Sequence, residues 1–196
     1  MSLRHWLARK WDSAARYLFL VAASTGFIRV ALFAGAGQHT YGKFNIADLG
    51  LCWMGDVLGP YSFSIGAGMF LLAHLMFVAA FVAYGLNRRR CLLSLVLIVP
   101  SGVILLWLMP QVDPPLRNLV IVYTVVITVM VITAGGTSRL IFASALVFYI
   151  SDIFVARWRF VDQDPFNAFV CYPHYYTACL LLAHSNLSDH NRTSAS

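Results

Sequence analysis

The feature that most restricts how this chain can fold is a series of seven apolar segments, each ended by proline, glycine or charged residues. A helix needs roughly 20 apolar residues to cross about 30 Å of hydrocarbon, and most of the segments approach that length. Because each segment is continuously apolar and does not alternate, helices are favoured over the strands of a barrel. The segments cover residues 17–34, 43–58, 62–85, 91–109, 117–134, 139–157 and 165–184.

The composition excludes an ordinary soluble domain, because 60% of the residues are hydrophobic and only 11% are charged. Soluble domains carry about 25% charged residues. The net charge of +6 does not predict a nucleic-acid partner, since basic residues such as Arg88–Arg90, Arg157 and Arg159 cluster between apolar segments. Lipid headgroups attract basic residues to such positions. We therefore predict an all-α, polytopic transmembrane helix bundle of about seven spans, within a range of roughly six to eight.

The chain divides into three parts by polarity. Residues 1–16 mix Trp and Leu with basic residues, which predicts an amphipathic segment at the membrane interface. Residues 17–184 form the predicted bundle, and the polar residues 185–196 are expected to be a disordered tail. The expected location is an integral, multi-pass position in a bacterial inner membrane, or in the endoplasmic reticulum of a eukaryote. The basic residues fall on both sides of a seven-span bundle, so charge assigns no orientation, and the sequence assigns no oligomeric state.

Two aspartates lie within apolar segments, where a carboxylate costs about 2.5–3.5 kcal/mol at mid-membrane. They are Asp56 and Asp152, whereas the other six acidic residues, all Asp, are assigned to loops or helix ends. The two belong to the second and sixth segments, so their helices run in the same direction. Both lie toward the carboxyl ends of these segments, which predicts a similar depth and is consistent with an internal parallel repeat.

Two carboxyl groups that share an apolar pocket cannot both ionise easily, which leaves one acid and one base at neutral pH. This pair suits acid-catalysed cleavage of an acetal-like or enol ether bond by water. The residues alone equally allow each aspartate to bond a basic or hydroxyl group between helices.

An ordered set of motifs resembles the YhhN-type lysoplasmalogenase family over residues 43–184. The set comprises Gly55 and Asp56 after an apolar run; Phe63, Gly66, Phe70, His74, Phe77 and Phe81 on one helical face; Tyr123 and Met130; Ala145, Phe148, Ser151 and Asp152; and Tyr175, Tyr176 and Ala178. The chain departs from the family pattern at Cys179, where a Gln is expected, and at Phe77, where a Tyr is expected. The family usually has a further helix before the first segment, which this chain is expected to lack.

The resemblance implies hydrolysis of the vinyl ether bond of a lysoplasmalogen, giving a fatty aldehyde and glycerophospho-ethanolamine or -choline. It implies Asp56 and Asp152 as the catalytic pair. Asp152 is slightly preferred as the acid, because more apolar sequence surrounds it. The partners expected are a lysophospholipid substrate and membrane lipids, with no cofactor and no metal.

Five further residues are candidates for substrate binding. His74 is expected to bond a carboxylate or the lipid phosphate, although a purely interhelical role is nearly as well supported. Tyr123, Tyr175 and Tyr176 are expected to orient water or the headgroup, while packing or interface anchoring is the more common role of membrane tyrosines. Ser151 is better explained by a bond to its own helix backbone than by a site role.

Two other classes of function fit the same aspartates. One is a transporter or receptor for a lipid or small amphiphile, in which the pair binds a proton or cation. The other is a scaffold, in which both aspartates make hydrogen bonds between helices.

Overall fold

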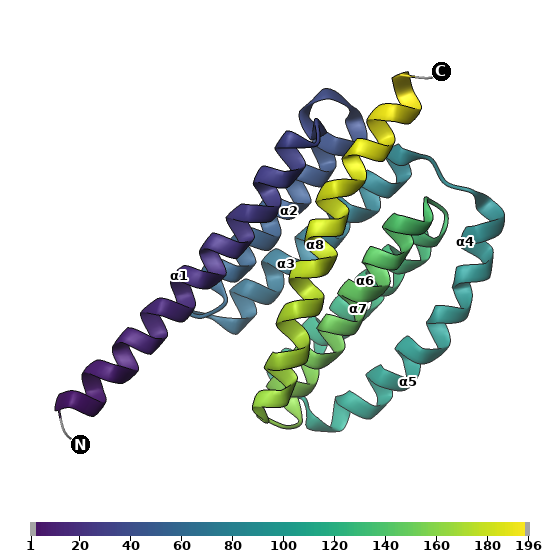
Figure 1. The fold of residues 1–196 in the computed structure, drawn as a ribbon. Coiled ribbons are helices and arrows are strands. Elements are labelled where there is room, and N and C mark those ends of the chain that lie inside the picture. The colour runs from purple at the N-terminus through teal and green to yellow at the C-terminus, as the bar shows by residue number, and fades with distance from the viewer. Residues whose placement is uncertain (1–2, 195–196) are drawn as a thin grey trace.

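The computed structural model describes the backbone of residues 3–194 and the side chains of residue 15 and residues 17–187 (Figure 1). Within these residues all regular structure is helical, which confirms the predicted helix bundle. The α-helices are α1 (Leu3–Phe33), α2 (Thr40–Leu58), α3 (Phe63–Tyr84), α4 (Arg88–Ser94), α5 (Ile98–Leu108), α6 (Arg117–Gly135), α7 (Arg139–Phe160) and α8 (Pro165–Ser194). Short 3₁₀ turns join several of them, at Ala36–Gln38, Leu95–Leu97, Met109–Gln111 and Pro114–Leu116.

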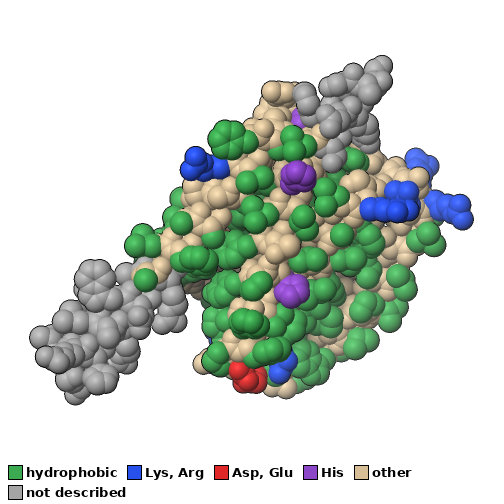
Figure 2. All heavy atoms as spheres, in the orientation of Figure 1, with side chains coloured by type: hydrophobic (Ala, Val, Ile, Leu, Met, Phe, Trp, Pro, Cys, Tyr) green, Lys and Arg blue, Asp and Glu red, His purple; other side chains and the backbone are tan. Residues whose placement is uncertain are grey.

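Four segments are long and apolar enough to cross a membrane, judged by length and composition within the described residues. They are Phe63–Tyr84, Arg88–Gln111, Pro114–Gly135 and Arg139–Phe160, and the apolar part of α1, Tyr17–Phe33, is shorter. The outer helices expose large apolar side chains that water would not tolerate; Leu106 is 76% exposed and Leu93 is 68% exposed. Figure 2 shows this hydrophobic surface between charged side chains at the ends of the bundle. The exposed apolar surface is that of a membrane protein.

Helices α2 and α3 form a close hairpin because glycine lies where their backbones meet. A Cβ atom on Gly66 would lie 2.6 Å from the Cα atom of Gly59. The turn also ends α2 at Leu58, and the Ser62 hydroxyl caps α3 by accepting from the backbone amide of Ile65 at 3.5 Å. The hairpin fixes the end of α2, where Asp56 lies.

Helices α7 and α8 form a second pair that packs extensively along its length. Asp164 starts α8 by accepting from the backbone amide of Phe166 at 2.8 Å. Helix α8 passes between α1 and α7 in Figure 1 and contacts both. It therefore carries side chains into the space between the α2–α3 hairpin and α7.

The bundle extends beyond the boundary expected at residue 184. Ser185 and Asn186 are buried, and the backbone of α8 stays helical to Ser194. Ser185 forms a hydrogen bond with Tyr41, and the Asn186 amide donates to Oδ1 of Asn45 at 2.7 Å. The first polar residues of the expected tail thus belong to the bundle, because α2 supplies polar partners for them. Residues 195–196 lie outside the described residues, as do the side chains of the expected interfacial segment apart from residue 15.

Helices α2 and α7 run in the same direction, with their carboxyl ends at the lower end of the bundle in Figure 1. This agrees with the orientation expected from the order of the apolar segments. The internal repeat itself stays a prediction.

Candidate active site

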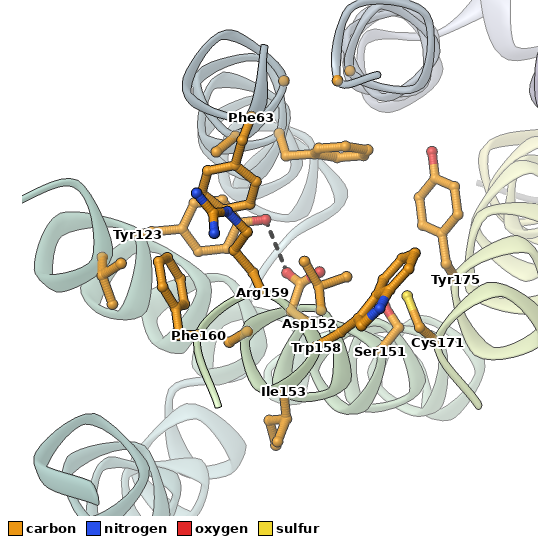
Figure 3. Close-up of a pocket in the computed structure, with 18 of the residues that line it drawn as sticks. Phe63, Tyr123, Ser151, Asp152, Ile153, Trp158, Arg159, Phe160, Cys171 and Tyr175 are labelled. Atoms are coloured by element: carbon orange, nitrogen blue, oxygen red, sulfur yellow. Dashed lines mark hydrogen bonds between the residues drawn. The ribbon is translucent and has the colours of Figure 1, made fainter. Parts of the chain in front are cut away.

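A cavity of about 620 Å³ lies between the α2–α3 hairpin and helices α6, α7 and α8 (Figure 3). It is close to one end of the bundle, because residues of the α2–α3 turn and of the segment after α7 contribute to its wall. Most of the wall is apolar. Both Asp56 and Asp152 line this cavity, as their common depth predicted.

Asp56 lies near the carboxyl end of α2 and is 9% exposed. Two hydroxyl groups donate to its Oδ2 atom: that of Ser24 on α1, and that of Tyr175 on α8 at 2.9 Å. Two donors to one oxygen stabilise an ionised carboxylate. Three helices thus meet at this single side chain.

Asp152 lies on α7 and is 15% exposed. The hydroxyl of Tyr123 on α6 donates to its Oδ2 atom at 3.0 Å, as drawn in Figure 3. Nε2 of His74 on α3 lies 3.4 Å from the same oxygen. Asp152 therefore has one hydroxyl and one imidazole as neighbours, whereas Asp56 has two hydroxyl groups.

His74 is 1% exposed and is held by its own helix. Its Nδ1 atom lies 2.5 Å from the carbonyl oxygen of Phe70, one turn earlier. A carbonyl oxygen can only accept, so Nδ1 carries the hydrogen and Nε2 is the atom presented to Asp152. The local geometry of α3 therefore selects the ring nitrogen that faces the carboxyl group.

Aromatic rings close the inner side of the cavity. The Tyr175 ring meets those of Phe70 and Phe148 edge to face, with centroids 5.6 and 5.4 Å apart. The His74 ring contacts Phe148 and Tyr123 at centroid separations of 5.0 and 5.3 Å. Gly55 permits this packing, because a Cβ atom there would lie 2.7 Å from the Phe70 ring. Of these rings, those of Phe70, Tyr123 and Tyr175 form part of the cavity wall.

Of the seven predicted site residues, five line the cavity: Asp56, Tyr123, Ser151, Asp152 and Tyr175. His74 does not line the cavity, but it contacts Asp152 and Tyr123, which do. Tyr176 is outside the lining and packs on Tyr175, with centroids 4.8 Å apart. The Ser151 hydroxyl donates to the Phe148 carbonyl at 2.8 Å, which is the backbone bond expected as its alternative role.

The two departures from the expected motifs do not lie on the cavity wall. Cys179 is completely buried on α8 and Phe77 is completely buried on α3, and neither lines the cavity. The chain therefore departs from the family motifs at buried positions and not on the cavity wall.

Two polar residues were not found from the sequence. Ser24 lies beside Thr25 in an otherwise apolar run, and nothing near it in the chain indicates a partner 32 residues away. Asp48 was assigned to a loop or helix end, and this is wrong, because it is completely buried within α2. Its Oδ1 accepts from the Asn45 amide at 3.5 Å. The sequence around Asp48 does not indicate this burial, because its partner Asn45 is in turn bonded by Asn186, which lies far away in sequence.

The arrangement offers two carboxyl groups in unlike surroundings on one apolar cavity, a pattern suited to paired acid and base chemistry. Within the described residues, no three His, Cys or Asp side chains are grouped as metal ligands.

Comparison with known proteins gives one match. The model of a family described as the YhhN family matches residues 15–186, which include every helix that lines the cavity. No curated protein and no solved structure matches the chain.

Proposed function

Because this chain belongs to the YhhN family, which is associated with hydrolase activity, we propose that it is a multi-pass membrane hydrolase of lysoplasmalogens. It cleaves the vinyl ether bond of lysoplasmenyl-ethanolamine or -choline. The products are a fatty aldehyde and the corresponding glycerophospho-ethanolamine or -choline. The observation that carries the proposal is that Asp56 and Asp152 line one apolar cavity with different hydrogen-bond partners.

Asp152 is the acid in this proposal. An unprotonated Nε2 on His74 beside an ionised Asp152 would bring two acceptors together where little water can reach them. The pair therefore holds a proton, either on the imidazole or on the carboxyl group. Delivered through the Asp152 carboxyl, this proton adds to the β-carbon of the enol ether and produces an oxocarbenium ion.

Asp56 is the base. Its ionised form is supported by the hydroxyl groups of Ser24 and Tyr175. As the oxocarbenium ion forms, the negative Asp56 stabilises it and accepts a proton from the attacking water, which yields a hemiacetal. Asp56 then returns that proton to the glycerol oxygen as the carbon–oxygen bond breaks. The hemiacetal hydroxyl gives its proton to Asp152, and both carboxyl groups return to their starting states.

The apolar wall supports a lipid substrate for a simple physical reason. The single alkenyl chain of the substrate exchanges the apolar bilayer interior for an apolar cavity. Its entry therefore costs little free energy. The vinyl ether then lies at the only carboxyl-bearing part of the described cavity wall. A soluble, charged substrate would have to cross this apolar lining.

The test is aldehyde release from lysoplasmenylethanolamine by the purified protein in detergent. Asp56→Asn and Asp152→Asn are assayed beside the parent, and gel filtration shows whether each variant is folded. The 1-O-alkyl analogue, which has a saturated ether, is the substrate control.

We expect release by the parent, no release from the saturated ether and loss of release in both folded variants. Activity that survives Asp56→Asn or Asp152→Asn removes that residue from the mechanism. If the folded parent releases no aldehyde, the hydrolase proposal is wrong. Proton-dependent uptake of the same lipid into vesicles would then support transport.

A further inference from the structure

Among the described residues that line the cavity, Arg159 is the one cation. It lies in the last turn of α7 and is exposed. Its guanidinium carbon lies 5.0 Å from the centre of the Phe63 ring and 5.5 Å from that of Phe160. Figure 3 shows the guanidinium beside the Phe63 ring on the cavity side of α7. The two rings hold the charge in place without neutralising it.

The neighbouring carboxylates are engaged elsewhere. Oδ1 of Asp162 accepts from the backbone amide of Asp164 at 3.1 Å, and Oδ1 of Asp164 accepts from the Phe166 amide at 2.8 Å. Within the described part of the chain, Arg159 has no ion pair with either of them or with Asp152. Its hydrogen-bond donors are therefore available to an anion in the cavity.

Arg159 is placed at a useful distance from the reacting end of the cavity. It follows Asp152 by seven residues on the same helix, which is close to two turns and so puts both on one face. The separation along the axis is about 10 Å, and the flexible arginine side chain can shorten or lengthen it. In a lysoplasmalogen, the glycerol unit separates the vinyl ether from the phosphate. A lipid with its vinyl ether at Asp152 would thus direct its phosphate toward Arg159.

The surrounding residues are typical of headgroup depth. Trp158 and Tyr172 meet edge to face at 6.2 Å beside the same end of the cavity, and both line it. Trp and Tyr gather where a bilayer meets water, which is where phosphates lie. The alkenyl chain of the lipid can therefore extend along the apolar wall while its headgroup stays at the end of the cavity that lies at the membrane–water interface.

We propose that Arg159 binds the phosphate of a single-chain ether phospholipid and thereby sets the position of the vinyl ether between the two aspartates. This inference rests on the proposed function for its substrate class. A guanidinium binds phosphate through two parallel hydrogen bonds, which fixes orientation as well as position. It also keeps the negative phosphate away from the carboxyl groups.

The experiment measures binding and not turnover, so that it can succeed or fail independently of hydrolysis. The probes are 1-O-alkyl-glycerophosphoethanolamine, which has no vinyl ether, and 1-O-alkylglycerol, which has no phosphate. Both are titrated into the full chain in detergent, for the parent, Arg159→Gln, Arg159→Lys and Arg157→Gln. Arg157 is the matched control, because it lies in the same last turn of α7 but does not line the cavity.

We expect the parent to bind the phosphate-bearing probe more tightly than the alkylglycerol. Arg159→Gln should weaken binding of the phosphate probe about tenfold or more and leave the alkylglycerol unchanged. Arg159→Lys should lose part of this affinity, and Arg157→Gln none. Excess phosphatidylethanolamine with two acyl chains should not displace the probe.

Several results would overturn the inference. An equal loss of affinity for both probes in Arg159→Gln would mean that Arg159 only supports packing of Phe63 and Phe160. Equal loss in Arg157→Gln would indicate a general surface charge effect, and displacement by the two-chain lipid would make Arg159 a bilayer anchor. A phosphate-dependent affinity that requires Arg159, in a protein that releases no aldehyde, would retain this site and reject the hydrolase.

Discussion

Nε2 of His74 lies 3.4 Å from Oδ2 of Asp152, while Nδ1, the other ring nitrogen, donates a hydrogen bond to the Phe70 carbonyl. One proton can therefore lie between a side chain of α3 and a side chain of α7, beside the cavity. His74 does not itself line the cavity, so its effect on a substrate would pass through Asp152.

We expect His74→Gln to lower the rate of aldehyde release about 100-fold or more, since the glutamine cannot hold and return a proton. The matched control is His174→Gln on α8. Its Nδ1 also bonds a carbonyl one turn earlier, that of Val170 at 2.7 Å, but it does not line the cavity. Initial rates of both folded variants decide the point. Equal rates in His74→Gln and the parent would reduce His74 to a packing residue.

Ser24→Ala should slow aldehyde release about tenfold or more, because the Asp56 carboxylate loses one of its two hydrogen-bond donors. Thr25→Val is the control on the next residue. The Thr25 hydroxyl bonds the Val21 carbonyl and accepts from the Trp53 indole at 3.2 Å, away from Asp56. The kcat of each purified variant is compared. A Thr25→Val effect as large as that of Ser24→Ala would point to displacement of α1 instead.

Gly66→Ala should destabilise the α2–α3 hairpin by about 1–3 kcal/mol, because the new methyl group would meet the backbone of Gly59. Gly68→Ala, two residues later on the same helix, meets no atom within 4 Å. It should leave stability unchanged or raise it by about 0.5–1 kcal/mol. Thermal unfolding in detergent distinguishes them, and similar unfolding temperatures would contradict the close contact.

Asp48→Asn should preserve both the fold and the rate of aldehyde release. Asp48 is completely buried, and its Oδ2 has no hydrogen-bond partner among the described residues. An amide of the same shape keeps the contact with Asn45 and is cheaper to bury than a carboxylate. The unfolding temperature should therefore not fall. A lower value would show that the Asp48 carboxyl has a stabilising partner.

The helices and the catalytic candidates could be predicted from the sequence because both follow from local properties. Apolar runs determine where helices form. An aspartate inside such a run is easily identified, because placing a carboxylate in the membrane costs free energy. The common depth of Asp56 and Asp152 followed from the order of the segments, since alternate helices run in the same direction.

The contacts between helices could not be predicted in this way. Ser24 bonds Asp56 only because α1 lies against α2, and a serine in an apolar helix gives no sign of its partner. Arg159 resembles any basic residue that flanks a membrane segment, and only its place on the cavity wall separates it from Arg157. Such information resides in the rotation of each helix about its axis, which hydropathy does not specify.

The cavity lies near one end of the bundle, at the α2–α3 turn and the end of α7. In the proposed hydrolase, a cavity at one end of the bundle would take its substrate from a single leaflet of the bilayer. Lysolipid in the opposite leaflet reaches it only after crossing the membrane, which a charged headgroup makes slow. The two leaflets would therefore lose this lipid at different rates, and the enzyme would create transbilayer asymmetry as it works.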